Sequence, residues 1–131
     1  MTNENYMSDD QFNDFLKTVE LKESRRGELI TRDFFELDNG WLGIIKRLVE
    51  DLKEIGWDGN IIQCKEKFGV LNFYCNSLTE KCHERVRKAE EESYYFCETC
   101  GDPGNTKNIG GWYSTLCKKH HEERLTKLYA K

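Results

Sequence analysis

The cysteines and histidines between residues 97 and 121 constrain this chain more than any other feature. Cys97 and Cys100 are separated by two residues, and after a sixteen-residue interval Cys117 is followed by His120 and His121. A Cys-x-x-Cys turn brings two thiolates to one ion, and a second ligand pair from elsewhere in the chain completes tetrahedral coordination. This spacing predicts a structural Zn²⁺ site with four protein ligands.

The identity of the fourth ligand depends on the register of a helix that begins near Cys117. His120 gives the Cys-x-x-His spacing, and His121 is also within reach of the same ion. His121, however, lies four residues before Leu125 on an apolar stripe, which favours packing towards the protein interior. We therefore predict Cys97, Cys100, Cys117 and His120 as the metal ligands, with His121 as the alternative to His120.

The residues between the two ligand pairs predict a hairpin and then a helix. Residues 102–105 (Asp-Pro-Gly-Asn) and Gly110-Gly111 are turn formers, so a short hairpin is expected between residues 106 and 115. Gly101 supplies the positive φ that such a knuckle requires, and Thr115 is a candidate N-cap for a helix running to about residue 131. A knuckle, a hairpin and a helix in this order form a treble-clef arrangement.

The charge of the chain is acidic and unevenly distributed. The 131 residues include 24 acidic and 20 basic side chains, a net charge of -4, with a pI near 5.5. Residues 1–60 hold fourteen acidic and eight basic side chains, net -6, whereas residues 61–131 hold ten and twelve, net +2. An acidic chain is a poor general binder of nucleic acid.

The state of the cysteines outside the predicted metal site depends on the cellular compartment. No apolar run approaches the length of a membrane span, and the first residues have neither a basic nor an apolar signal region, so we expect a cytoplasmic protein without a membrane partner. In a reducing compartment cysteines are ligands or small buried apolar residues rather than disulfides. Cys64 and Cys75 are therefore predicted to be buried.

Upstream of the metal module the pattern predicts helices around a β-hairpin. Apolar residues recur with helical period at 9–22, 41–56 and 78–95, while residues 29–37 have no clean period and suit a short helix or an extended arm. In the run 60–75, a turn at Phe68-Gly69 places Cys64 opposite Phe73. One face of this hairpin is then apolar: Ile62, Cys64, Leu71, Phe73 and Cys75.

These patterns predict an α+β fold in which helices pack on a small antiparallel sheet, with a C-terminal treble-clef-like zinc module. The expected organisation is a flexible N-terminus at 1–8, an α+β domain at 9–95, and a zinc-binding module at 96–131 packed on that domain. The metal module can stabilise a segment too small to form a core of its own.

No catalytic motif in the sequence is complete. His83-Glu84 is similar to part of the zinc-deaminase signature, but position 85 is Arg, and Cys97 follows Phe96 where that signature has Pro. A ββα-metal nuclease needs a His that acts as general base on its hairpin, and residues 101–116 contain no His. Four protein ligands leave no coordination position for water or substrate, so we predict a non-enzymatic protein.

Two motifs together resemble a group of small bacterial and prophage-encoded proteins. The first is Lys-Glu-Lys-Phe-Gly-Val-Leu-Asn-Phe-Tyr at 65–74, and the second combines Cys-Glu-x-Cys-Gly-x-Pro-Gly at 97–104 with Gly-Trp-x-x-Thr-Leu-Cys-x-x-His at 111–120. The resemblance covers about residues 41–121 and carries no established activity. In size, acidity and lack of an active site, the chain is also similar to immunity proteins of bacterial toxin systems such as contact-dependent growth inhibition.

Two classes of function follow. The first is a binding protein that neutralises a basic toxin domain, and the acidic first half favours it because opposite fields speed association; its candidate side chains are Asp33, Glu36, Asp38, Glu50, Asp51, Glu54 and Asp58. The alternative is a small zinc-finger nucleic-acid-binding or regulatory protein of prophage origin. That protein would use the basic side chains of the last helix: Lys118, Lys119, Arg124 and Lys127.

Overall fold

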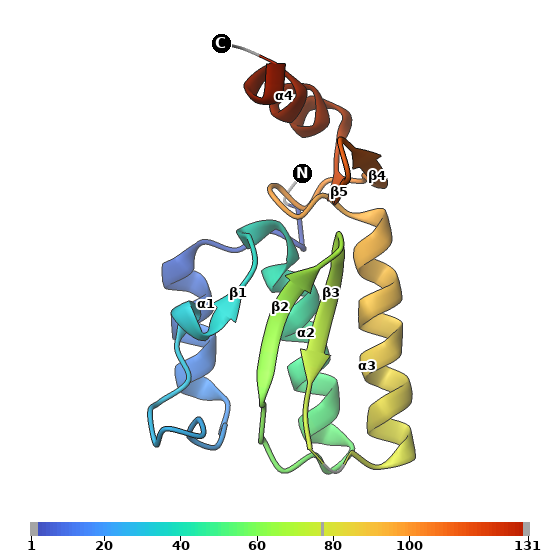
Figure 1. The fold of residues 1–131 in the computed structure, drawn as a ribbon. Helices are drawn as coiled ribbons and strands as arrows, with labels where there is room; N and C mark the ends of the chain where they lie inside the picture. Colours follow the sequence, from blue (N-terminus) through green and yellow to red (C-terminus); the bar gives the residue numbers. More distant parts are fainter. Residues whose placement is uncertain (1–2, 77, 130–131) are drawn as a thin grey trace.

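The computed structural model describes residues 3–76 and 78–129 and confirms the α+β class (Figure 1). Its α-helices are α1 (Asp9–Thr18), α2 (Leu42–Glu54), α3 (Glu80–Glu92) and α4 (Lys118–Tyr129). Its strands are β1 (Phe35–Glu36), β2 (Gln63–Lys67), β3 (Val70–Tyr74), β4 (Asn105–Ile109) and β5 (Trp112–Leu116). Three 3-10 turns, η1 (Arg32–Phe34), η2 (Asn39–Trp41) and η3 (Ser93–Tyr95), join these elements.

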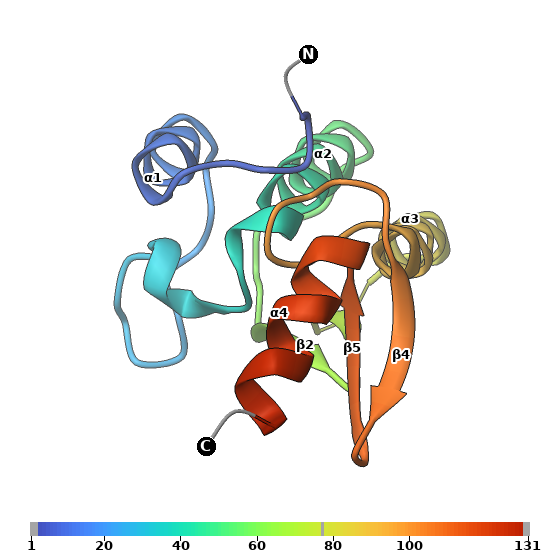
Figure 2. The same ribbon diagram turned by 90° about the horizontal axis from the view of Figure 1, so that it is seen from above.

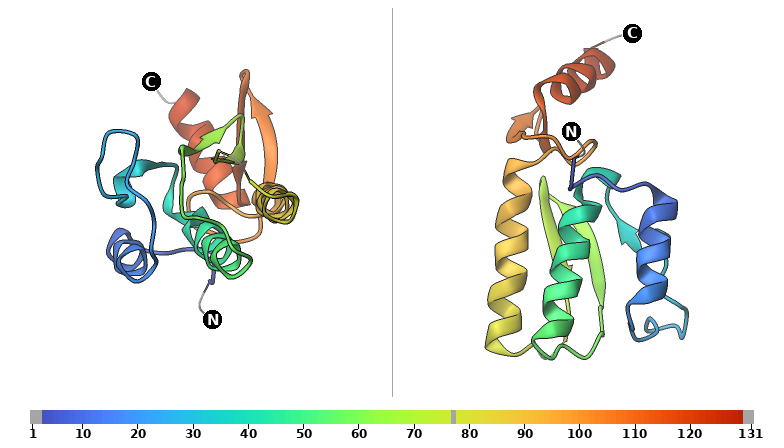
Figure 3. Two further views of the ribbon diagram at one scale, coloured as in Figure 1. Left: turned by 90° about the horizontal axis from the view of Figure 1, so that it is seen from below. Right: turned by 180° about the vertical axis from the view of Figure 1, so that it is seen from behind.

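Helix α2 is the centre of the core. Its apolar stripe repeats with helical period, and Ile44, Leu48 and Leu52 are fully buried. Seen from behind, α2 lies over the β2–β3 hairpin (Figure 3), and Figure 2 shows α1, α2 and α3 around one side of β2. The amphipathic run predicted at 41–56 therefore forms the helix that the rest of the domain covers.

The β2–β3 hairpin has the predicted register. Cys64 pairs with Phe73, the turn is Phe68-Gly69, and Phe68 has a left-handed φ of 53°. Cys64, Leu71 and Phe73 are buried against the helices, while alternate residues face outwards. Cys64 is buried as predicted, whereas Cys75 is only half-buried. Burial still raises the pKa of the Cys75 thiol to about 12.

Strand β1 makes the sheet mixed rather than purely antiparallel. The 29–37 segment forms η1 followed by β1, and Phe35 pairs in parallel with Cys64. Helix α2 lies between β1 and β2 in the chain, and a helical crossover returns the chain in the same direction, which produces parallel pairing. Two residues of strand are too few to give a period-2 signal, so sequence patterning did not predict this strand.

The free edge of β3 is capped by side chains of the segment that follows it. The Leu71 N–H donates to Ser93 Oγ at 3.0 Å, and the Phe73 N–H donates to Glu90 Oε2 at 3.0 Å. An uncapped edge offers unpaired backbone donors to other chains. Burial raises the pKa of the Glu90 carboxyl, which is held against this edge.

The N-terminal region differs from expectation in two ways. Helix α1 begins with a capping box between Ser8 and Gln11 but ends at Thr18 rather than near residue 22, because the following segment runs extended and the Lys22 N–H donates to the Gly59 carbonyl at 2.9 Å. Residues 3–7, expected to be loose, lie against α2, and Asn5 is buried.

Candidate metal centre

The first ligand pair lies on a tight knuckle after η3. The Cys97 N–H donates to the Asp102 carbonyl, and the Gly101 N–H donates to the Cys97 carbonyl, each at 2.7 Å. Gly101 has a φ of 81°, as predicted, a conformation that glycine adopts without strain. This backbone turn directs both Cys97 and Cys100 to one side.

The second pair lies where the β4–β5 hairpin passes into α4. Cys117 follows β5, and its carbonyl accepts the His121 N–H at 2.9 Å in the first turn of the helix. Thr115 is not the N-cap, contrary to our prediction. It is a buried residue of β5 whose hydroxyl donates to the Gly69 carbonyl and lies 2.6 Å from Thr106 Oγ1, so it joins the β4–β5 hairpin to the β2–β3 turn.

The four predicted ligands converge. One ligand atom from each of Cys97, Cys100, Cys117 and His120 lies within 4.8 Å of every other, and these form the one such group of His, Cys, Asp or Glu in residues 3–76 and 78–129. Cys100 Sγ and Cys117 Sγ are 3.8 Å apart, while His120 Nδ1 lies 3.4 Å from Cys97 Sγ and 3.1 Å from Cys117 Sγ.

These distances fit a tetrahedral site. Zinc bonds of about 2.3 Å to sulfur and about 2.0 Å to nitrogen place two sulfurs about 3.8 Å apart, and a sulfur and a nitrogen about 3.5 Å apart. All six cysteines of the chain are free thiols, so no disulfide competes for these sulfurs. The cluster can therefore hold one metal ion.

The two histidines of α4 have different environments. His120 directs Nδ1 to the thiols, and its Nε2 lies 3.7 Å from Glu123 Oε2, in the position of a carboxylate that orients a metal-bound imidazole. His121 is 2% exposed, and its Nε2 lies 2.9 Å from the Asn105 carbonyl oxygen. The geometry thus favours His120 as the ligand and assigns His121 to packing of α4 on β4.

Without a cation the thiols differ in acidity. Burial and the neighbouring thiols Cys97 and Cys117 raise the pKa of Cys100 to about 12. Burial also opposes ionisation of Cys117, but hydrogen bonds from the His120 and Lys119 N–H groups and from the neighbouring thiols lower its pKa overall. A dication would stabilise all three thiolates, so metal binding releases protons.

The knuckle is docked on the start of α2. The Gly40 N–H donates to the Glu98 carbonyl at 2.7 Å, and Trp41 Nε1 donates to the Phe96 carbonyl at 2.8 Å. A Cβ at residue 40 would overlap the carbonyl oxygens of Cys97 and Glu98, so this close approach requires glycine. Glu98 Oε2 accepts the Asp38 N–H at 3.0 Å, and burial raises the pKa of this carboxyl to about 7.

An N-terminal strap braces the knuckle, and sequence reasoning missed it. We use this name for residues 3–7, in which Asn3 Nδ2 donates to the Cys100 carbonyl at 2.8 Å and Asn5 Nδ2 donates to the Gly101 carbonyl at 3.1 Å. Asn5 Oδ1 also accepts Arg47 Nη2 at 2.6 Å. These partners are more than 40 residues away in the chain, and no local pattern links them.

Comparison with known protein families, characterised proteins and solved structures finds no match for this chain. None of the helices in the described part of the chain has the length and apolarity needed to cross a membrane; the longest, α2 and α3, have 13 residues each, against about 20 for a span.

Proposed function

We propose that the cluster binds one Zn²⁺ in a structural role. Three thiolates and one imidazole are a donor set that zinc prefers, and the 3.8 Å separation of the Cys100 and Cys117 sulfurs matches its tetrahedral geometry. With four protein ligands the ion has no position left for water or substrate, which supports a non-catalytic site. The ion would hold the knuckle, the β4–β5 hairpin and α4 in one arrangement.

The function that we propose for the whole chain is stoichiometric binding to a basic toxin domain, that is, an immunity protein. The supporting observation is that the acidic side chains named for this role all stand exposed: Asp33, Glu36, Asp38, Glu50, Asp51, Glu54 and Asp58. Three of them form ion pairs within the chain, Glu50 with Lys46, Asp51 with Arg85 and Asp58 with Lys22. The charge of the other four can act on a cationic partner and increase its association rate.

Co-expression tests this function. The toxin domain encoded by the neighbouring gene is expressed in cells with or without this chain, and survival of the cells is measured. An inactive variant of the toxin domain is then expressed together with this chain, and the two proteins are purified together. We expect survival of the cells and a one-to-one complex. Survival without a complex would contradict stoichiometric binding, and death of the cells despite abundant folded protein would contradict immunity.

A second candidate function, binding of nucleic acid, is favoured by a separate observation. Phe68, Trp112 and Tyr113 are 68%, 65% and 47% exposed, and Lys67 lies beside Phe68 with its Nζ 5.9 Å from the ring centroid. Exposed aromatic rings with cations nearby can stack unpaired bases. Retention on single-stranded DNA or RNA at physiological salt, lost in a Lys118→Gln/Lys119→Gln variant or in Phe68→Ala, would favour this function over immunity.

A further inference from the structure

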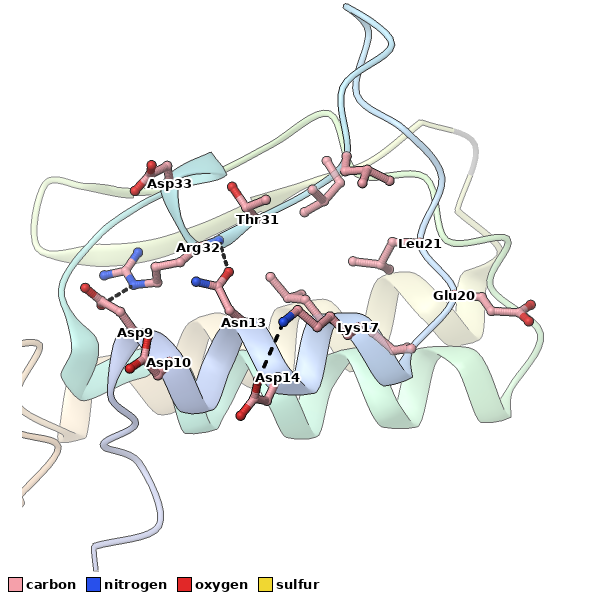
Figure 4. Close-up of a pocket in the computed structure, with 14 residues that line it drawn as sticks. Asp9, Asp10, Asn13, Asp14, Lys17, Glu20, Leu21, Thr31, Arg32 and Asp33 are labelled. Carbon is pink, nitrogen blue, oxygen red and sulfur yellow. Dashed lines mark hydrogen bonds and ion pairs between the residues drawn. The ribbon is translucent and has the colours of Figure 1, made fainter.

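A groove runs between α1 and the arm formed by residues 20–33. It has a volume of 1020 Å³ and is lined by α1 on one wall and by the arm, which includes part of η1, on the other (Figure 4). The arm is tied at both ends, because the Arg32 N–H donates to Asn13 Oδ1 at 2.9 Å and the Lys22 N–H donates to the Gly59 carbonyl at 2.9 Å. The groove is thus part of the folded structure.

The lining of the groove includes apolar side chains that the core does not fully cover. Leu16 is buried, whereas Val19, Leu21 and Ile30 are partly exposed and Leu29 is 78% exposed. An isolated exposed leucine needs no explanation, but one that lines a groove beside three further aliphatic side chains offers a surface for an apolar side chain of a partner.

The rim of the groove is acidic on both walls. Five carboxylates line it against two cations, Lys17 and Arg32. Both cations are already in ion pairs, Arg32 with Asp9 at 3.1 Å and Lys17 with Asp14 at 3.9 Å. Figure 4 shows the remaining carboxylates on both sides. Within residues 3–76 and 78–129, three of them have no ion-pair partner: Asp10, Glu20 and Asp33.

The charges and apolar side chains of the groove favour a polypeptide over a metal ion or a nucleic acid. No three carboxylates in the described residues converge as metal ligands, which argues against a bound divalent cation. A rim with an excess of three negative charges repels phosphate groups, which argues against nucleic acid. A polypeptide that carries both lysine or arginine and an aliphatic side chain complements the rim and the lining together.

We propose that this groove receives a basic amphipathic segment of the protein partner, with cationic side chains facing Asp10 and Asp33 and an aliphatic side chain against Leu29. The inference rests on the proposed function, since the partner is the basic toxin domain. It assigns the contact to the α1 side of the molecule and leaves the metal module as a structural support away from that contact.

Calorimetric titration of the full-length, zinc-loaded chain with the inactive toxin domain tests the groove. We expect Asp10→Asn/Asp33→Asn to weaken binding by about tenfold or more and Leu29→Ser by about threefold or more. The matched controls are Glu84→Gln/Glu91→Gln, which removes two exposed charges from α3, and Leu128→Ser, which removes an exposed leucine from α4. Both controls should bind like the parent protein.

The outcomes separate the inference from the function on which it rests. If the parent protein and the groove variants bind the toxin domain equally tightly, the groove is not the contact site, and the immunity function is unaffected. If the parent protein neither binds nor protects, both fail. The Arg25-Arg26 pair of a second copy is also basic, so a concentration-dependent dimer of the chain alone, abolished by Asp33→Asn, would replace the partner by self-association and overturn the inference.

Discussion

At the residue scale, the contacts of two adjacent histidines give them different roles. His120 and His121 follow one another in α4, yet one imidazole lies among three thiols and the other against the Asn105 carbonyl. Helical geometry explains the difference, since adjacent residues point about 100° apart. Ligation and packing are therefore distinct roles that substitution can separate.

Replacing each histidine by alanine tests this assignment. We expect His120→Ala to release the metal, because three ligands remain, and His121→Ala to retain it while lowering stability by about 1–3 kcal/mol through the lost packing and hydrogen bond. Metal content and chemical denaturation measure the two effects. The opposite result, with metal lost only from His121→Ala, would place α4 in a different register.

Glu90 gives a pH-dependent prediction. Its folded-state pKa is raised, chiefly by burial, so the folded state binds the proton more tightly and the contribution of Glu90 to stability falls as pH rises from the unfolded value through the raised one. Glu90→Gln keeps an acceptor for the Phe73 N–H without the charge. We expect the free energy of unfolding of Glu90→Gln, relative to the parent, to increase from pH 5 to pH 7.5.

Denaturation at several pH values measures this difference in the free energy of unfolding. The pH dependence that comes from the metal site cancels in the difference, because both proteins carry that site. Glu84→Gln serves as the control, since Glu84 is exposed on the same helix. A Glu90→Gln variant that loses stability relative to the parent as pH rises would show that the ionised carboxylate is the favoured partner of the β3 edge.

At the element scale, local sequence patterns predicted the elements that have a regular spacing of apolar residues or cysteines. The stripe of α2, the β2–β3 register and the Cys-x-x-Cys knuckle depend on neighbours within a few residues, and the structure confirms them. Strand β1 and the N-terminal strap depend on partners far along the chain, and sequence patterning did not reveal them. The misplaced N-cap at Thr115 has the same cause, because its hydroxyl bonds to the distant Gly69 carbonyl.

The strap supplies a prediction of its own. Asn5→Ala removes hydrogen bonds to the Gly101 carbonyl and to Arg47, and each buried group left unpaired costs about 1–3 kcal/mol. We expect lower stability and faster loss of zinc to a chelator. Asn72→Ala, at an exposed position of β3, is the control. Equal rates of zinc loss in all three proteins would mean that the strap does not brace the knuckle.

At the scale of the whole molecule, a bound metal would link the knuckle, the β4–β5 hairpin and α4. The metal module contacts the domain through hydrogen bonds to Gly40, Trp41 and Gly69, and its own buried apolar residues are few. Small modules of this kind depend on a bound metal for their fold. The acidic groove lies beside α1, away from the β4–β5 hairpin and α4, so the proposed contact surface and the proposed metal site are separate.

We propose that Cys97, Cys100, Cys117 and His120 hold one structural zinc, and metal analysis of the freshly purified chain measures the metal that they bind. We predict close to one equivalent of zinc in the parent protein, little in Cys100→Ser or Cys117→Ser, and an unchanged amount in Cys64→Ser, whose thiol lies in the core. A parent protein without metal, or a Cys100→Ser variant that keeps its full equivalent, would contradict the account.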